Sequence, residues 1–178
     1  ADLIIINAIE LLNGVSFCSC TIESVLHKIP KLTEDFLYFN DDMLLTAPLS
    51  PKDLFDNTGK PIWYQESDIL LRFISQNSYL INPFNLDGHV SKARQNTFQQ
   101  LGLNKKMPPP IGHSPRIFNK TYIKKFILLY PEAVEQLRKK LFRSEDTFCF
   151  VDAYCYYFSH HNMLNFLKKK NNQITTMI

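Results

Sequence analysis

Three adjacent polar residues, Asn40, Asp41 and Asp42, interrupt the apolar stretch that runs from 37 to 45. A short apolar run of this kind predicts a buried strand, which here would end at Asn40. Ligands of open α/β sheets bind beyond the carboxyl ends of strands, and Mg²⁺ takes carboxylate oxygens together with substrate phosphates. We therefore expect Asp41 and Asp42 to bind a metal ion and to activate a hydroxyl group. The alternative is an Asx-rich turn, because Asn and Asp also favour turns.

A histidine and an arginine farther along the chain are the next candidates. His113 follows a proline-rich loop, which would hold its ring in place for proton transfer or for a hydrogen bond to phosphate. Arg143 follows a predicted helix, and its guanidinium group can bind phosphate oxygens with two hydrogen bonds. The alternatives are a surface histidine and, for Arg143, a salt bridge to Asp146 or a contact with the helix dipole.

A second polar pair, Arg94 and Asn96, is a further candidate for substrate contacts. Residues two apart on a helix point in different directions, so we expect one of the two to be merely solvated. The helix that carries them is one of several that the apolar spacing predicts, together with strand 37–40. The expected helices cover residues 21–29, 90–101, 117–130, 132–142 and 148–158, and Pro131 suits the first turn of the fourth.

Length and composition fit one α/β domain or one lobe of a larger enzyme. The chain has 178 residues, of which 45% are hydrophobic, so it can bury one core. Its net charge of +3 fits anionic substrates or an acidic membrane surface without requiring either. Only five glycines are present and none forms a glycine-rich phosphate loop, which argues against a Rossmann cofactor site or a P-loop. The four cysteines, Cys18, Cys20, Cys149 and Cys155, are expected to be reduced thiols of a cytoplasmic protein.

The order of these motifs resembles that of a known family. The segments 22–30 and 36–43 (IESVLHKIP and FLYFNDDM) are similar to the second conserved region of the Stealth sugar-phosphate transferases. These include bacterial capsule polysaccharide phosphotransferases and the catalytic subunit of the animal lysosomal-enzyme phosphotransferase. Residues 112–115 (GHSP) resemble the histidine-proline motif of the third region, and residues 142–146 (FRSED) resemble its arginine-containing end. The first region would lie upstream of Ala1, and residues 1–19 depart from the family pattern.

The resemblance implies an activity and a set of site residues. Stealth proteins transfer a hexose or N-acetylhexosamine 1-phosphate from a UDP-sugar to a glycan hydroxyl, releasing UMP and forming a phosphodiester, in capsule or exopolysaccharide synthesis. The implied cofactor is Mg²⁺ or Mn²⁺, and the implied partners are a UDP-sugar donor and a glycan acceptor, with no nucleic acid. The implied location is cytoplasmic, and peripheral association with the inner face of the membrane stays open. The implied catalytic residues are Asp41, Asp42, His113 and Arg143, and the implied substrate contacts are Asn40, Arg94, Asn96 and Asp146.

The expected organisation is a small sheet with a helical C-terminal half, as part of a larger Rossmann-like transferase domain. Residues 1–165 would form a partial catalytic domain and residues 166–178 a polar basic tail. One alternative is a truncated, non-catalytic remnant that binds a sugar nucleotide. Another is a DxD-type glycosyltransferase that releases UDP, which the spacing of Asn40, Asp41 and Asp42 does not favour. The sequence predicts no oligomeric state.

Overall fold

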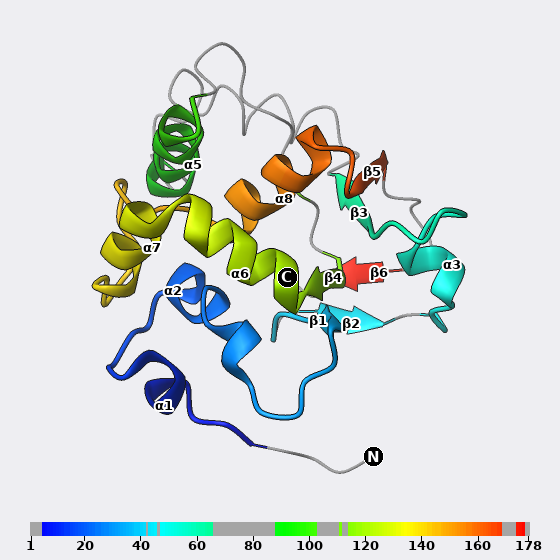
Figure 1. Ribbon diagram of the computed structural model, residues 1–178, viewed down its shortest axis with the longest axis horizontal. Coiled ribbons are helices and arrows are strands. Elements are labelled where there is room, and N and C mark those ends of the chain that lie inside the picture. Colours follow the sequence, from blue (N-terminus) through cyan, green and yellow to red (C-terminus); the bar gives the residue numbers. More distant parts are fainter. Residues whose placement is uncertain are drawn as a thin grey trace.

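The fold is mixed α/β, as the sequence predicts. The computed structural model describes residues 5–41, 43–45, 47–65, 88–102, 111, 114–168 and 174–176. In Figure 1, helix α8 lies between α5 on the left and the β3–β5 pair on the right, and α6 extends from near α7 to β4. The elements are α1 (Ala8–Leu12), α2 (Ser19–Glu23), η1 (Leu26–Lys28), β1 (Asp35–Tyr38), β2 (Met43–Leu45), α3 (Pro51–Leu54), β3 (Ile62–Gln65), α5 (Gly88–Gln100), β4 (Arg116–Asn119), α6 (Lys120–Leu129), α7 (Pro131–Arg138), α8 (Phe150–His160), β5 (Asn165–Lys168) and β6 (Ile174–Thr176).

Within the described residues, the strands form three two-stranded sheets. β1 pairs antiparallel with β4, and this register places Tyr38 opposite Arg116. β2 pairs antiparallel with β6, whereas β3 and β5 are parallel. The end of β1 therefore lies in an antiparallel pair. The sequence predicts that this end would lie at the edge of an open α/β sheet. The antiparallel ladder instead brings an arginine from β4 across from the tyrosine that precedes the Asn40–Asp41 turn.

A large aromatic core holds these elements together. Phe126 of α6 is fully buried and contacts Tyr154 and Phe158 of α8, with ring centroids 6.1 and 6.4 Å away. Trp63 of β3 is also fully buried, and its indole N–H donates to the carbonyl of Ile117 at 2.9 Å. These contacts join residues far apart in the chain, so the positions of α2, β1, β4 and α8 depend on one common core.

The structure confirms some predicted helices and divides others. The predicted helices at 90–101 and 148–158 are present as α5 and α8, and Pro131 begins α7 as expected. The helix predicted over 21–29 is wrong in its middle: α2 ends at Glu23 and a 3-10 turn follows. There the Ser24 hydroxyl donates to the carbonyl of Thr21 at 2.7 Å, one of the local bonds by which serine competes with regular helix.

The helix predicted over 117–130 begins three residues later, at Lys120. The side chain of Asn119 accepts a hydrogen bond from the N–H of Tyr122 at 2.9 Å and so caps α6. The residues before this cap pair with β1 as strand β4. Helix α7 ends at Arg138, before the predicted end at 142. The four cysteines are buried and free, and no described helix has the length and hydropathy to cross a bilayer.

Candidate functional site

The chain turns directly after β1, as two carboxylates serving one site would require. The N–H of Met43 donates to the carbonyl of Asn40 at 3.2 Å, which closes a turn around Asp41. Asp41 is exposed, whereas the side-chain oxygen of Asn40 is buried and has no hydrogen-bond partner within the described part of the chain. A buried acceptor without a partner is unusual and suits a ligand. Asp42 and His113 lie outside the described residues.

A buried carboxylate, Glu23, lies near the end of β1. Only 6% of its surface is exposed, and its Oε1 accepts a hydrogen bond from the hydroxyl of Tyr38 at 3.3 Å. Tyr38 and Arg116 are opposite each other on β1 and β4, and residues so paired present their side chains to the same face. Arg116 is also buried, and its charge acts on Glu23.

Burial raises the pKa of Glu23 to about 7, because a carboxylate without water is costly to ionise. The charge of Arg116 and the hydrogen bond from Tyr38 oppose this effect, and Asp152 adds to it. Arg143 lowers the pKa slightly. A carboxyl group with a pKa near 7 can accept a proton at neutral pH, which is the requirement for a general base.

An ion pair between α5 and α8 adjoins this carboxylate. The Nε of Arg94 donates to Oδ1 of Asp152 at 2.8 Å, and the exposed fractions of the two side chains are 7% and 21%. Asn96 is also engaged, since its Nδ2 donates to the carbonyl of Glu145 at 2.9 Å. The expectation that Arg94 or Asn96 is merely solvated is therefore wrong, because both bind groups from the C-terminal part of the chain.

Arg143 lies at the exposed edge of the cluster. Its Nη2 donates to the hydroxyl of Ser19 on α2 at 2.5 Å. The alternative salt bridge to Asp146 is not formed; Lys140 binds that carboxylate at 2.5 Å. Hydrogen bonds from Lys140 and Ser144 hold the pKa of Asp146 at about 2. A cavity of about 480 Å³ is lined by Arg143, Ser144, Glu145 and Asp146.

The cluster combines two carboxylates with three guanidinium groups. We define the Glu23 cluster by the residues Glu23, Tyr38, Arg94, Arg116, Arg143 and Asp152. Its positive groups outnumber its negative ones, so it can bind an anion such as a diphosphate. Of the predicted site residues, Arg94 and Arg143 belong to it, and Asn40 follows Tyr38 by two residues. Asp146 lies in the segment between α7 and α8, and Asn96 of α5 binds the carbonyl of Glu145 in that segment.

Sequence reasoning missed Glu23, Tyr38, Arg116 and Asp152 as site residues. A signal was present for Glu23, because it is a carboxylate within a stretch of core spacing formed by Ile22, Val25 and Leu26. No comparable signal marked Arg116, which the pattern placed just before a helix. Its function depends on the pairing of β1 with β4, which brings together residues 78 positions apart.

The oxygen donors near β1 fit a hard cation better than a soft one. Asn40 offers a buried, unpaired carbonyl oxygen and Asp41 an adjacent carboxylate, and Mg²⁺ needs few protein ligands when substrate phosphates supply the rest. Among the described residues, no group of three or more histidine, cysteine or acidic side chains is arranged to hold a metal ion by itself.

Part of the chain matches a known family model. The profile described as Stealth protein CR2, conserved region 2, matches residues 3–62. This range includes α2, β1 and β2, and it corrects the expectation that residues 1–19 depart from the family pattern.

Three relatives illustrate the similarity. A capsular polysaccharide phosphotransferase of Streptococcus pneumoniae is 53% identical over 45 residues, which is 25% of this chain and 14% of that protein. One from Neisseria meningitidis serogroup B is 27% identical, over 67% of this chain and 31% of the relative. An exopolysaccharide phosphotransferase of Streptomyces coelicolor is 26% identical, over 81% of this chain and 26% of the relative. The chain thus spans less than a third of the length of each of these proteins.

The matched region contributes Glu23 and Tyr38, and the longer alignments extend the similarity over most of the chain. The chain therefore carries a segment that matches the second conserved region of the Stealth family.

Proposed function

We propose that this protein is a sugar-phosphate transferase of capsule or exopolysaccharide synthesis. It would transfer a hexose or N-acetylhexosamine 1-phosphate from a UDP-sugar to a hydroxyl group of an acceptor glycan. The acceptor oxygen attacks the phosphorus on the sugar side, and the bond from that phosphorus to the bridging oxygen breaks. UMP leaves, a phosphodiester forms, and the sugar keeps its anomeric configuration because its carbon–oxygen bond is untouched. The names of the relatives support phosphotransfer in polysaccharide synthesis.

The observation that carries the proposal is the buried carboxylate Glu23 with arginines around it. Phosphoryl transfer requires charge neutralisation and positioning more than covalent catalysis. We assign Glu23 as the base that takes the proton of the acceptor hydroxyl, since its pKa of about 7 suits that step. Arg143 and Arg116 would stabilise the negative charge of the diphosphate, and Tyr38 would orient Glu23.

The other predicted residues keep their proposed roles. Asp41, together with Asn40 and Asp42, would hold a Mg²⁺ or Mn²⁺ ion, which would neutralise diphosphate oxygens when bound. His113 stays a proposed proton donor or phosphate ligand. Arg94 would act through Asp152 by fixing the carboxylate next to Glu23.

Substitution of the base tests the assignment. In the full-length protein, Glu23→Gln should lower the rate of UMP release from the cognate UDP-sugar by at least about 100-fold, because general-base catalysis contributes about that much. In the unsubstituted enzyme, kcat/KM should rise with pH to a plateau with an apparent pKa near 7. Glu132→Gln, at an exposed position of α7, is the matched control and should leave the rate unchanged. A folded Glu23→Gln variant with the original rate and pH profile would refute the role of Glu23.

A further inference from the structure

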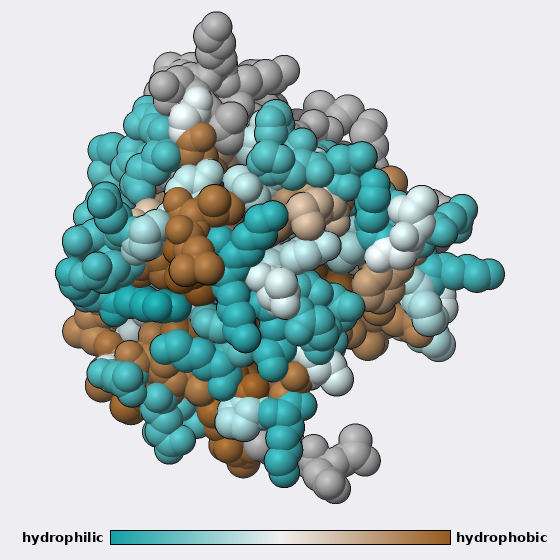
Figure 2. All heavy atoms as spheres, viewed as in Figure 1, coloured by the Kyte–Doolittle hydropathy of each residue, from teal (hydrophilic) through white to brown (hydrophobic). Residues whose placement is uncertain are grey.

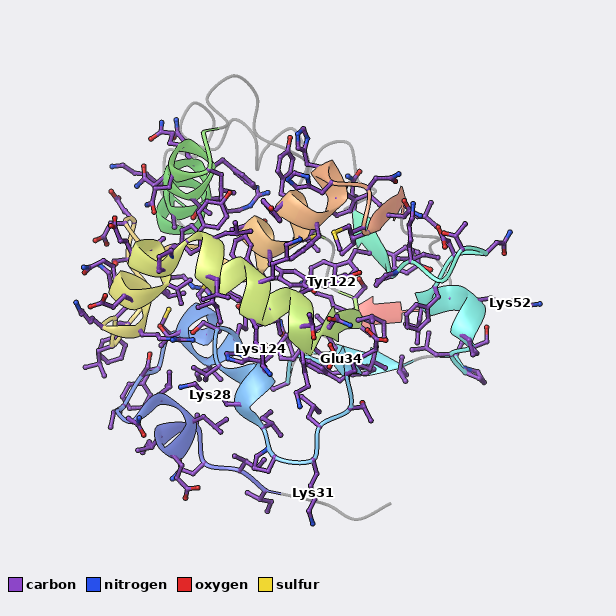
Figure 3. All side chains as sticks on the ribbon, viewed as in Figure 1. Lys28, Lys31, Glu34, Lys52, Tyr122 and Lys124 are labelled. Atoms are coloured by element: carbon purple, nitrogen blue, oxygen red, sulfur yellow. The ribbon has the colours of Figure 1, made fainter. Side chains whose placement is uncertain are left out.

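Four cations gather where η1 packs against α6. Lys28 lies on η1, Lys120 and Lys124 lie on α6, and Arg138 lies at the end of α7; we call these four residues the basic face. Figure 3 shows Lys28 and Lys124 close together on the same side of the molecule, with Glu34 beyond them. The basic face is thus a local group of positive charges in a chain whose net charge is only +3.

The basic face is not neutralised by carboxylates. Lys28 donates to the carbonyl of Leu11 at 2.9 Å, and Lys120 donates to that of Leu32 at 3.1 Å. Arg138 donates to the hydroxyl and the carbonyl of Ser24, at 3.2 and 3.0 Å. Within the described residues, none of the four cations forms an ion pair with an acidic side chain, in contrast to the lysines at 92, 139 and 140.

Among the described residues, Glu34 lies near Lys120 and Lys124, and it has other partners. The carboxylate of Glu34 accepts a hydrogen bond from the N–H of Thr121 at 2.8 Å. The pKa of Glu34 lies below its usual value because the side chain of Thr121 and then this N–H donate to its carboxylate, and Lys120 and Lys124 contribute. One exposed carboxylate leaves most of the positive charge of the basic face available for a ligand.

A histidine at the centre of the basic face is sensitive to this charge. His27 is half-buried, and its Nδ1 has no hydrogen-bond partner among the residues that the structure describes. Burial, together with the smaller effect of the four cations in the same direction, lowers the pKa of His27 to about 4. His27 is therefore neutral at physiological pH, and any anion bound here would raise its pKa.

The basic face is continuous with the candidate site. Arg143 binds Ser19 at the start of α2, and Arg138 binds Ser24 just after its end. Glu23 precedes Ser24 directly, and Lys28 lies farther along the same segment. Cations thus accompany this segment from the Glu23 cluster to η1. A ligand with several negative charges along its length could contact the cluster and the basic face together.

We propose that the basic face binds an anionic glycan whose phosphodiester groups repeat along its length. This inference rests on the proposed function, since each transfer adds one phosphodiester and therefore one negative charge to the product. Successive charges spaced along a chain suit cations spaced along a segment, as in other polyanion binding. The surface also differs from a membrane-binding one, which places apolar side chains at its centre. Here the centre is His27, and the exposed Leu128 and Leu129 lie at the end of α6, where Figure 2 shows an apolar patch.

A binding measurement with the full-length protein tests this inference. The probe is a purified capsular polysaccharide with phosphodiester-linked repeats, and neutral dextran is the uncharged control. Lys124→Glu should weaken binding at low salt by at least about fivefold, because it reverses an exposed charge at the centre of the basic face. Lys52→Glu makes the same charge change on α3, far from the basic face in Figure 3, and should weaken binding by less than about twofold.

A second readout locates the ligand. The NMR titration of His27 should move to higher pH when the polysaccharide is bound, and dextran should leave it unchanged. Equal losses in Lys124→Glu and Lys52→Glu would overturn the proposal, because binding would then follow net charge alone. Binding of phosphatidylglycerol vesicles that depends on Lys124, with no binding of the polysaccharide, would overturn it in favour of a membrane surface. Failure of the proposed reaction would appear separately, as absent UMP release with polysaccharide binding intact.

Discussion

Burial of the Glu23 carboxylate is unfavourable for folding, but it gives this side chain a role in the site. Its carboxyl group is almost fully buried, and it accepts a hydrogen bond from the hydroxyl of Tyr38 beside the nearby charge of Arg116. Burial without full compensation is what raises its pKa. An apolar or amide side chain would suit the core better, so a carboxylate here is the kind of local compromise found at functional sites.

The raised pKa predicts how stability changes with pH. The pKa of Glu23 is about 7 in the folded chain and near 4.5 when the chain is unfolded, so the native state retains the proton longer. The contribution of Glu23 to stability is therefore fully present below about pH 4.5 and is lost as pH rises to about 7. His27 acts in the opposite direction, because its lowered pKa makes stability rise between about pH 4 and 6.5.

Comparison with one variant separates these two effects. Between pH 4.5 and 7.5, the free energy of unfolding of the original protein should fall by about 2–3 kcal/mol relative to that of Glu23→Gln. Urea unfolding monitored by the fluorescence of Trp63 across this range measures the difference. Parallel curves for the two proteins would mean that Glu23 titrates normally.

The ion pair of Arg94 and Asp152 should matter for stability, since it is largely withdrawn from water. Asp152→Asn would leave a buried guanidinium group with less compensation and should lower the free energy of unfolding by roughly 2–4 kcal/mol. The exposed pair of Lys139 and Glu135 is the control, and Glu135→Gln should cost less than about 0.5 kcal/mol. If both variants lost a similarly small free energy of unfolding, burial would not make the Arg94–Asp152 pair more stabilising than the exposed one.

At the level of elements, α6 and α8 form the packing unit that positions the site. Phe126 of α6 contacts rings of Phe150, Tyr154 and Phe158, all on α8. Helix α8 also positions Asp152 in the Glu23 cluster. The geometry of the site therefore depends on aromatic packing between α6 and α8, which α7 separates along the chain.

Truncation of Phe126 tests this dependence. Phe126→Ala removes a fully buried ring and should lower the free energy of unfolding by about 3–5 kcal/mol, because a cavity remains. Leu128→Ala on the same helix removes a side chain that is 79% exposed and should change it by less than about 0.5 kcal/mol. Thermal or chemical unfolding of both variants provides the measurement, and a small loss for Phe126→Ala would place the core elsewhere.

The elements differ in how well the sequence predicts them. α5 and α8 were predictable because they are long and their apolar residues recur at helical spacing. β4 was not, since Arg116–Asn119 continues without a break into α6 and only the cap at Asn119 separates them. Asn165 of β5 pairs with Ile62, and Thr176 of β6 pairs with Met43; these partners are 103 and 133 residues away, which local patterns cannot reveal.

The residues of the site also divide into those that the sequence predicts and those that it does not. Arg94 and Arg143 were identifiable as single residues with suitable chemistry, and the structure brings both to the Glu23 cluster. The members contributed by strand register and helix packing, Arg116 and Asp152, were not. The sequence therefore indicates the kind of chemistry. It does not show which charged groups contact each other, because that depends on how the core brings the elements together.

At the scale of the whole molecule, the Glu23 cluster and the basic face form two connected parts of one surface. The Glu23 cluster would carry the reaction, and the basic face would hold the charged polymer beside it. Both adjoin the segment from α2 to η1, which lies within the residues that match the Stealth family model. The chain spans less than a third of three of its relatives, so the complete protein is the right material for any activity measurement.

The most direct test follows the phosphorus on the sugar side of the donor. A UDP-sugar with a radioactive label in that β-phosphate, incubated with the full-length protein and an acceptor glycan, should transfer the label to the polymer while unlabelled UMP is released. Release of labelled UDP with an unlabelled polymer would mean that the carbon–oxygen bond breaks instead, and it would contradict the account of this protein as a sugar-phosphate transferase.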